Sequence, residues 1–242
     1  MDLRQDQFHK LNFFLTTGHP CSYLRGRAAR NLVADPEAID NAVYAELASL
    51  GFRRSGNYVY RPHCTGCTEC FSLRVPAVGF SPNRTQERVW KNNCDLNIQT
   101  VGTQFNLEHY NLLKRYIKAR HPDGGMDDTT PEGYLSFITS CWSDTRLYEF
   151  RLSNRLLAVA VTDRLDGGLS AVYTFFDPDE SSRSLGTYAI LWQIDQAKHQ
   201  GLSWVYLGYW VRESRKMSYK ANYQPHQILI AGRWICPVWH VA

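Results

Sequence analysis

The chain has 242 residues, and 44% of them are hydrophobic, which is enough for the core of one large domain or of two small, closely packed ones. This composition excludes a chain that is disordered throughout, and the formal net charge of +4 favours a polyanionic partner only mildly. No basic leader is visible, nor the roughly 20 consecutive apolar residues that span a bilayer, so a cytoplasmic location is expected.

The first part of the chain is expected to form a small α+β unit. Asp35 followed by Pro36 predicts the start of an amphipathic helix of about four turns. The Ser-Gly-Asn sequence at 55–57 predicts a hairpin turn, and the alternation over 71–76 predicts a strand. We therefore expect residues 1–100 to form a cysteine-containing N-terminal region.

Residues 101–242 are expected to form a second, larger region. Its periodicity and turn residues predict helices over 105–118, 130–141, 184–200 and 213–221, a loop over 121–128, a three-strand antiparallel meander over 146–152, 156–163 and 169–176, and further strands over 203–207 and 227–230. A meander followed by a loop, a helix and another strand is the order of a GNAT-type acyltransferase. The expected fold class is thus α+β, with a GNAT-like domain, although fold alone does not give function.

The sharpest local signal is the loop that opens the predicted helix at 184–200. A loop between a buried strand and a helix presents backbone N–H groups and the positive helix end to an anion. A plain helix N-terminus is the alternative, because the loop has only one glycine. The candidate anion-binding residues of this loop, which the family resemblance described below implies to contact tRNA, are Arg183, Leu185, Gly186 and Tyr188.

A second signal combines aromatic and basic residues over 206–223. Lys216 and Lys220 are four residues apart, as are Tyr219 and Tyr223, so each pair would share a face of a helix. Aromatic rings with interleaved cations can stack bases and neutralise phosphates. The alternative is a solvated cationic face with a tyrosine stripe in the core. The candidate contacts of this segment are Tyr209, Trp210, Lys216, Tyr219 and Lys220.

Seven cysteines, three of them bunched together, suit a reduced compartment better than a disulfide framework. Cys64, Cys67 and Cys70 are spaced three residues apart, and Cys21 is an upstream candidate for a fourth ligand. This spacing suits zinc or an iron–sulfur cluster. Free thiols are the alternative, and the sequence leaves the choice open.

Several stretches together resemble the aminoacyl-tRNA-protein transferases, and within them the bacterial aspartate/glutamate leucyltransferase branch. The matching stretches are 21–24, 60–67, 74–76, 80–84, 168–178, 184–186 and 206–210 through Tyr223. The resemblance implies an N-terminal cysteine-bearing region packed on a GNAT-like domain. It also implies leucyl-tRNA as donor and proteins that begin with Asp or Glu as acceptors, marked by leucine for degradation in the N-degron pathway. Leu24 stands where the arginine-transferring branch has a cysteine, so an iron–sulfur cluster is not simply carried over.

The implied reaction is attack of an α-amine on an aminoacyl ester. Because the pKa of an α-amine is about 7.7 to 8.0, positioning and oxyanion stabilisation should suffice, and no cofactor is required. Asp163 or Asp177 is expected to orient the amine, and Tyr173 is a third candidate catalytic residue. Tyr173, Phe175 and Trp192 are also expected to line a pocket for the leucyl side chain.

An acidic acceptor side chain calls for a cation, for which Arg74 and Arg84 are the candidates. Three alternatives stay open. The first is an acetyl-CoA-dependent N-acetyltransferase. The second is a transferase that moves arginine instead of leucine. The third is an RNA-binding or metal-sensing module that catalyses no reaction.

Overall fold

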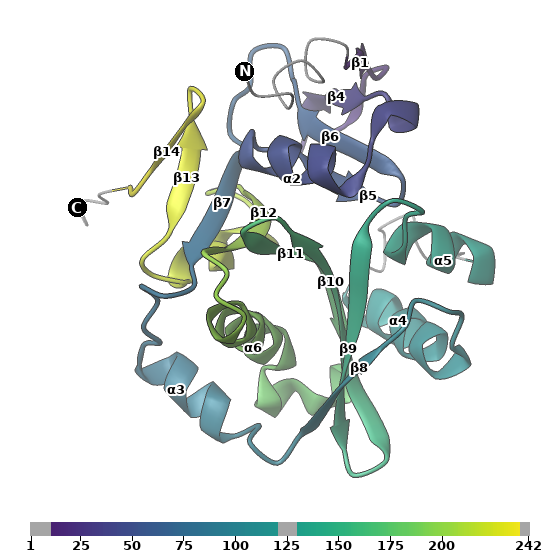
Figure 1. The fold of residues 1–242 in the computed structure, drawn as a ribbon, viewed down its shortest axis with the longest axis vertical. Helices are drawn as coiled ribbons and strands as arrows, with labels where there is room; N and C mark the ends of the chain where they lie inside the picture. The colour runs from purple at the N-terminus through teal and green to yellow at the C-terminus, as the bar shows by residue number, and fades with distance from the viewer. Residues whose placement is uncertain (1–10, 121–129, 238–242) are drawn as a thin grey trace.

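The computed structural model describes residues 11–120 and 130–237, so the loop predicted at 121–128 lies outside the described residues. Within these ranges the largest sheet has eight strands (Figure 1). In spatial order they are β14 (Arg233–Ile235), β13 (Gln227–Ile230), β7 (Phe71–Pro76), β12 (Trp204–Trp210), β11 (Gly168–Phe176), β10 (Arg155–Leu165), β9 (Asp144–Leu152) and β8 (Asn97–Val101). We call this the large sheet.

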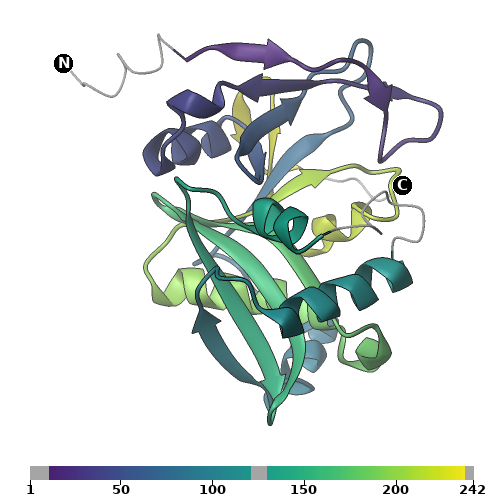
Figure 2. The ribbon, with the colours of Figure 1, turned by 90° about the vertical axis from the view of Figure 1, so that its right-hand side faces the viewer.

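A smaller sheet is built from the N-terminal part of the chain. Its spatial order is β1 (Phe13–Leu15), β4 (Asn31–Ala34), β6 (Tyr58–Pro62) and β5 (Arg53–Ser55), beside a short pair, β2 (His19–Pro20) and β3 (Ala28–Ala29). Helix α2 (Asn41–Ser49) packs on it, and Figure 2 shows this unit at one end of the large sheet. The small sheet and α2 therefore form a compact cap.

Helices cover both faces of the large sheet (Figure 1). Helices α6 (Leu185–His199) and α3 (Arg84–Lys91) share one core with the sheet, whereas α4 (Leu107–Arg120) and α5 (Pro131–Ile138) share the other. Strand β10 serves both cores because neighbouring residues of a strand point to opposite faces: Ala158 faces the first core and Val159 the second. Within the described residues, no helix is long and apolar enough to cross a membrane.

Strand β7 joins the two predicted regions into one sheet. It comes from the first third of the chain, yet it lies between β12 and β13 and pairs antiparallel with both. The boundary expected after residue 100 falls inside β8, which pairs with β9. The predicted boundary between residues 1–100 and 101–242 therefore does not coincide with a boundary between two sheets, because the large sheet contains strands from both regions.

Most of the predicted elements are confirmed. The hairpin at 55–57, the strands at 71–76 and 227–230, the three-strand meander and the helices α4, α5 and α6 are all present. The helix expected from Pro36 is divided into a 3-10 helix η1 (Pro36–Ala38) and α2, because the Asp40 side chain accepts a hydrogen bond from the Val43 N–H and caps a new helix. Helix α3 and strands β8 and β14 are additions to the predicted elements.

The helix predicted over 213–221 is wrong. The described chain forms turns there, followed by the 3-10 helix η3 (Ser218–Asn222). Tertiary contacts override the helical spacing, since the Lys220 Nζ donates to the Tyr209 carbonyl at 2.7 Å and the Trp210 indole donates to the Ser218 carbonyl at 3.3 Å. Lys220 is consequently buried, whereas Lys216 is exposed, and the two do not share a face.

Candidate functional site

Strands β11 and β12 are parallel neighbours that pair only at their beginnings. The described pairs are Gly168–Trp204, Leu169–Val205 and Ser170–Tyr206. Along its other edge, β12 pairs with β7 as far as Trp210, with an irregularity between Tyr206 and Gly208. Residues 171–176 of β11 and 207–210 of β12 are therefore unpaired with one another, and we call this place the β11–β12 opening.

Helix α6 begins at the β11 side of this opening. A Cβ atom on Gly186 would lie 3.0 Å from the Phe176 ring, so the first turn of the helix touches the end of β11. Ser184, the N-cap residue, has a left-handed conformation and its side chain makes no cap hydrogen bond. The start of α6 thus presents backbone N–H groups beside the opening, as the sequence suggested.

The side chains predicted around this helix start point elsewhere. Leu185 and Tyr188 are buried, and Tyr188 packs edge-on against Trp90 and Phe150. Arg183 binds Asp95 at 2.9 Å. Any nucleic-acid contact here would therefore use the backbone and the small Gly186 rather than these side chains.

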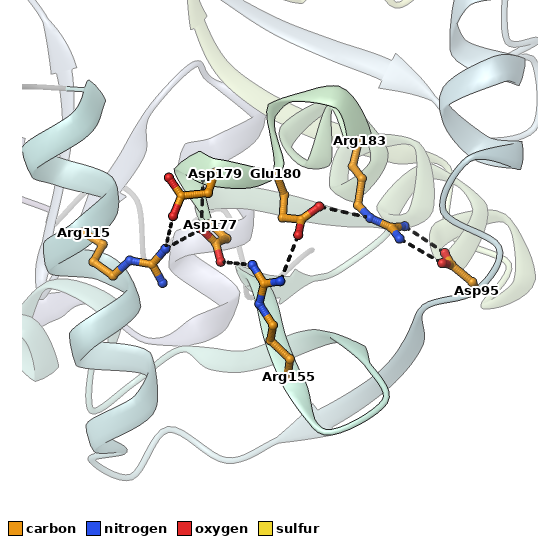
Figure 3. A network of polar contacts seen from close by, with 7 residues as sticks. All are labelled: Asp95, Arg115, Arg155, Asp177, Asp179, Glu180 and Arg183. Atoms are coloured by element: carbon orange, nitrogen blue, oxygen red, sulfur yellow. Dashed lines mark hydrogen bonds and ion pairs between the residues drawn. The ribbon is translucent and has the colours of Figure 1, made fainter.

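An ion-pair network holds the segment that leads into α6 (Figure 3). Asp177 caps the 3-10 helix η2 (Pro178–Arg183), and its carboxylate binds Arg115 at 2.6 Å and Arg155 at 2.7 Å. The chain of contacts continues from Arg155 to Glu180 (3.0 Å), from Glu180 to Arg183 (3.4 Å) and from Arg183 to Asp95. Helix α4, strand β10 and Asp95 are thereby tied together at η2, which directly precedes α6.

Asp177 is ionised in this network. Burial on its own raises the pKa of Asp177, but hydrogen bonds from Arg155 and from the Asp179 backbone outweigh it and hold the pKa below its usual value. A small pocket of about 210 Å³ lies beside it, between α4 and β10. Both carboxylate oxygens are already bound by arginines. The role predicted for Asp177 in orienting an amine stays a prediction.

Asp163 is committed to a buried ion pair. Both of its oxygens accept from Arg54 of β5, at 2.5 and 2.7 Å, and Thr145 donates to one of them at 2.7 Å. The side chains of Asp163 and Arg54 are 0% exposed, so an acceptor amine has no access to this carboxylate in the structure. The pair joins the small sheet to the large one.

Tyr173 lies among aromatic rings on the α4 side of the large sheet. Its ring centroid is 5.0 Å from that of Phe137 and 6.2 Å from that of Tyr116. Phe175 belongs to the same core, but Trp192 packs against Tyr148 on the α6 side. The structure therefore does not bring the three residues of the expected leucyl pocket together, because the sheet separates Trp192 from the others.

The two arginines predicted to bind the acceptor are far from equivalent. The Arg74 guanidinium is stacked between the Trp204 and Trp234 rings, 3.7 and 4.2 Å from their centroids, and donates to Gln227 at 2.8 and 2.9 Å. Burial lowers the pKa of Arg74. Arg84 is exposed in the first turn of α3. Neither side chain is held at the β11–β12 opening by a contact in the structure.

A different pair of cations meets at β12. Gly208 has a φ of +73°, and a Cβ atom built on it would lie 3.2 Å from the Arg53 Nη1 and 3.8 Å from the Lys220 Nζ. The Tyr209 ring lies 5.8 Å from the Arg53 guanidinium, and its hydroxyl donates to the Tyr60 carbonyl at 2.9 Å. The predicted contacts Tyr209 and Lys220 are thus inside the protein, whereas Lys216 and Tyr219 are exposed.

Two family models match the chain. The model described as Arginine-tRNA-protein transferase, C terminus, matches residues 108–230. The model described as Arginine-tRNA-protein transferase, N terminus, matches residues 19–88. The chain belongs to the arginine-tRNA-protein transferase family.

Relatives of this transferase match nearly its whole length. An aspartate/glutamate leucyltransferase of Hahella chejuensis is 51% identical over 226 residues, which are 93% of this chain and 97% of the relative. Another of the same name, from Nitrosococcus oceani, is 52% identical over 229 residues, 94% of this chain and 96% of the relative. These relatives confirm the resemblance to the bacterial branch. Among solved structures, L-PGS from Bacillus licheniformis is 10% identical, with a TM-score of 0.44 over 59% of this chain and 47% of that one.

Four cysteines of the transferase lie near one another in the cap. Cys21, Cys64, Cys67 and Cys70 are partly buried and form no disulfide. Burial, with the neighbouring thiols as smaller causes, raises the pKa of Cys70 to about 12, and Arg27 donates to the Cys67 Sγ at 3.5 Å. Among the described residues, no group of three or more His, Cys, Asp or Glu side chains is arranged to hold a metal ion. A zinc or iron–sulfur site in the transferase stays a prediction.

Sequence reasoning missed Arg53 and Gly208 of the transferase, although each left a signal. Arg53 and Arg54 are consecutive in a strand, so their side chains point to opposite faces and both cannot face solvent in a strand packed on one side. Gly208 interrupts the apolar strand Trp204–Trp210, and a glycine inside a strand often marks an irregularity or a close approach.

Proposed function

We infer that this transferase moves leucine from leucyl-tRNA to the N-terminal amine of proteins that begin with aspartate or glutamate. The observation that carries this conclusion is its 51% identity to a relative named aspartate/glutamate leucyltransferase, over 97% of that relative. The added leucine then marks the acceptor for degradation in the N-degron pathway. Because aminoacyl-tRNA is a cytoplasmic metabolite, the cytoplasm is the proposed place of the reaction.

We propose a GNAT-like arrangement for the large sheet. The antiparallel meander of β9, β10 and β11, the following helix α6 and the parallel strand β12 support it. In this arrangement the 3′ end of the tRNA lies at the start of α6, whose free N–H groups and dipole favour a phosphate. The leucyl ester then lies in the β11–β12 opening, next to the aromatic rings around Tyr173.

The chemistry needs little beyond placement. The neutral α-amine attacks the ester carbonyl, an amide C–N bond forms, the C–O bond to the terminal ribose breaks, and the amine proton leaves to the ribose oxygen. With an amine pKa of about 7.7 to 8.0, the reactive fraction grows as the pH rises toward 8. Positioning and stabilisation of the oxyanion therefore supply the acceleration, and no cofactor is proposed.

A transfer assay tests this function directly. The protein is mixed with tRNA charged with labelled leucine and with a peptide that begins with Asp, beside a peptide that differs only by an N-terminal Ala. Label is expected on the Asp peptide alone and disappears after treatment with RNase. Parallel mixtures contain arginyl-tRNA or acetyl-CoA as donor. Transfer from either of these, with none from leucyl-tRNA, would contradict the proposal.

A further inference from the structure

Two cations, the buried Lys220 and the partly buried Arg53, meet beneath the surface of this protein. Arg53, on β5 of the cap, and Lys220, on η3, approach one another at the backbone of Gly208. Within residues 11–120 and 130–237, no carboxylate forms an ion pair with either of them. Buried charges in proteins are usually paired, because removing an ion from water is costly. Two adjacent cations without a counterion among the described residues therefore need an explanation.

The described surroundings of the two cations are aromatic and polar. The phenol groups of Tyr60, Tyr23 and Tyr209 lie around Arg53. Lys220 donates to the Tyr209 carbonyl at 2.7 Å, and burial, with Arg53 as the second cause, brings the pKa of Lys220 well below its usual value. The protein thus keeps two mutually repelling cations side by side, as a site prepared for an anion would.

The cations lie next to the β11–β12 opening. Gly208, which both approach, is part of β12 at the opening itself. Tyr219, the residue before Lys220, lies near both Arg53 and Tyr116, and the Tyr116 ring lies 4.9 Å from Phe176 at the end of β11. The pair is therefore on the cap side of the place where the leucyl ester is proposed to bind.

We propose that Arg53 and Lys220 bind the side-chain carboxylate of the N-terminal Asp or Glu of the acceptor protein. The proposal rests on the proposed function and adds the residues that select the substrate. The planar guanidinium of Arg53 matches the two oxygens of a carboxylate, and Lys220 adds a second charge. A carboxylate held by both would place the α-amine of the same residue toward the opening.

The two arginines expected from the sequence do not offer this site. Arg74 is stacked between two indole rings and bound to Gln227, and Arg84 is exposed on α3. The Arg53 guanidinium lies 5.8 Å from the centre of the Tyr209 ring and forms no ion pair within the described part of the chain. An incoming carboxylate does not have to displace another acid of the described residues from it.

The test compares peptides that differ only in charge at the first residue. Leucine transfer to Asp and Asn peptides, and to Glu and Gln peptides, is measured for the wild type, Arg53→Met, Arg53→Lys and Lys220→Met. Arg61→Met is the matched control, because Arg61 lies on neighbouring β6 over the ring of Phe52 and its side chain points to the face opposite that of Tyr60. Calorimetry measures binding of the same peptides without tRNA, and circular dichroism checks the fold.

Arg53→Met is expected to lower the ratio of Asp to Asn transfer by about tenfold or more, since a hydrogen-bonded charge is removed. Lys220→Met lowers the same ratio. Arg53→Lys keeps part of it because the charge remains without the planar fork. Arg61→Met keeps the wild-type ratio. The affinity for leucyl-tRNA stays unchanged in all variants.

Two results would overturn the assignment. In the first, Arg53→Met and Lys220→Met both keep the wild-type preference for Asp over Asn. In the second, Arg53→Met weakens leucyl-tRNA binding and slows transfer to all peptides equally, which would place a tRNA phosphate at these cations. Failure of the proposed leucine transfer can be distinguished from failure of the carboxylate site. If the wild type transfers no leucine but binds the Asp peptide more tightly than the Asn peptide, and Arg53→Met removes that difference, the carboxylate site stands alone. Equal binding of both peptides by the wild type would sink the site as well.

Discussion

Lys220 shows at a single residue how a site is kept at the expense of stability. Its ammonium is buried, and its pKa is lowered by burial and by the charge of Arg53. Between the folded pKa and the ordinary value, the unfolded chain binds a proton that the folded protein does not. Stability therefore rises with pH in that window and is reduced at neutral pH.

Lys220→Met is accordingly expected to stabilise the protein at pH 7, by about 1 kcal/mol, while it impairs transfer to acidic peptides. The advantage of the variant shrinks as the pH rises toward the ordinary lysine pKa, because the wild type then gains stability. Urea unfolding of both proteins at several pH values measures this difference. A variant that is less stable than the wild type at every pH would show that the hydrogen bond to Tyr209 outweighs the buried charge.

Gly208 is a second residue whose effect on the site can be isolated. Its φ of +73° strains any side chain, and a Cβ atom there would press on the Arg53 Nη1 at 3.2 Å. Gly167 has a φ of +77°, and a Cβ atom added to it would meet none of the described atoms within 4 Å, so Gly167→Ala carries the strain alone. Both substitutions are expected to cost about 1 to 2 kcal/mol.

Gly208→Ala should in addition lower the Asp to Asn transfer ratio, whereas Gly167→Ala should leave it unchanged. The measurement is the same pair of peptide assays, with thermal unfolding as the measure of strain. Equal ratios for the two variants would mean that the methyl group does not disturb Arg53.

At the scale of elements, the 3-10 helix η2 positions the start of α6 through Asp177. The carboxylate is buried, and the two arginines that hold it come from α4 and β10. Asp177→Asn is expected to lower stability by about 2 kcal/mol, because hydrogen bonds to a charged group are lost. It should also weaken leucyl-tRNA binding without changing the Asp to Asn ratio, since the helix start moves and the cation pair does not.

The pH dependence gives this prediction a sign. The pKa of Asp177 is lowered in the folded protein, so its contribution is present above the ordinary aspartate pKa and is lost as the pH falls through the folded value. The stabilities of wild type and variant should therefore converge in acid. Asp179→Asn is the control, because Asp179 binds the same Arg115 at 2.8 Å but is 79% exposed, where an ion pair adds little. A loss as large in Asp179→Asn would contradict the special role of Asp177.

The elements themselves were largely predictable, because periodicity and turn residues act locally. Strand β7 was found at its true bounds, yet its place between β12 and β13 depends on pairing with residues more than a hundred positions away. The helix expected over 213–221 failed for the same kind of reason, since the bond from Lys220 to Tyr209 is tertiary. The helix start at α6 was predicted in its place, but its role at the site stays a prediction. The consecutive Arg53 and Arg54 indicated that their side chains point to opposite faces, but only tertiary contacts show what each of them meets.

At the scale of the whole molecule, the cap and the large sheet are joined by a buried charge pair. Arg54 of β5 reaches Asp163 of β10 with two hydrogen bonds, and its guanidinium also donates to the Ile138 carbonyl at 3.0 Å. The proposed acceptor site lies at the same junction, with Arg53 from the cap and Gly208 from the large sheet. Transfer should therefore depend on the two parts remaining docked.

Asp163→Asn is expected to cost about 3 kcal/mol or more, because it leaves the Arg54 guanidinium buried without its counterion. Replacing both partners, as Arg54→Met with Asp163→Leu, should cost much less than either loss alone, since no unpaired charge remains. Urea unfolding of Arg54→Met, Asp163→Leu and the double variant measures the coupling free energy between the two residues. Leucine transfer by the folded double variant then separates the two roles of Asp163: retained transfer means that the carboxylate docks the cap, whereas transfer abolished in a stable double variant would return Asp163 to the catalytic role predicted from its sequence.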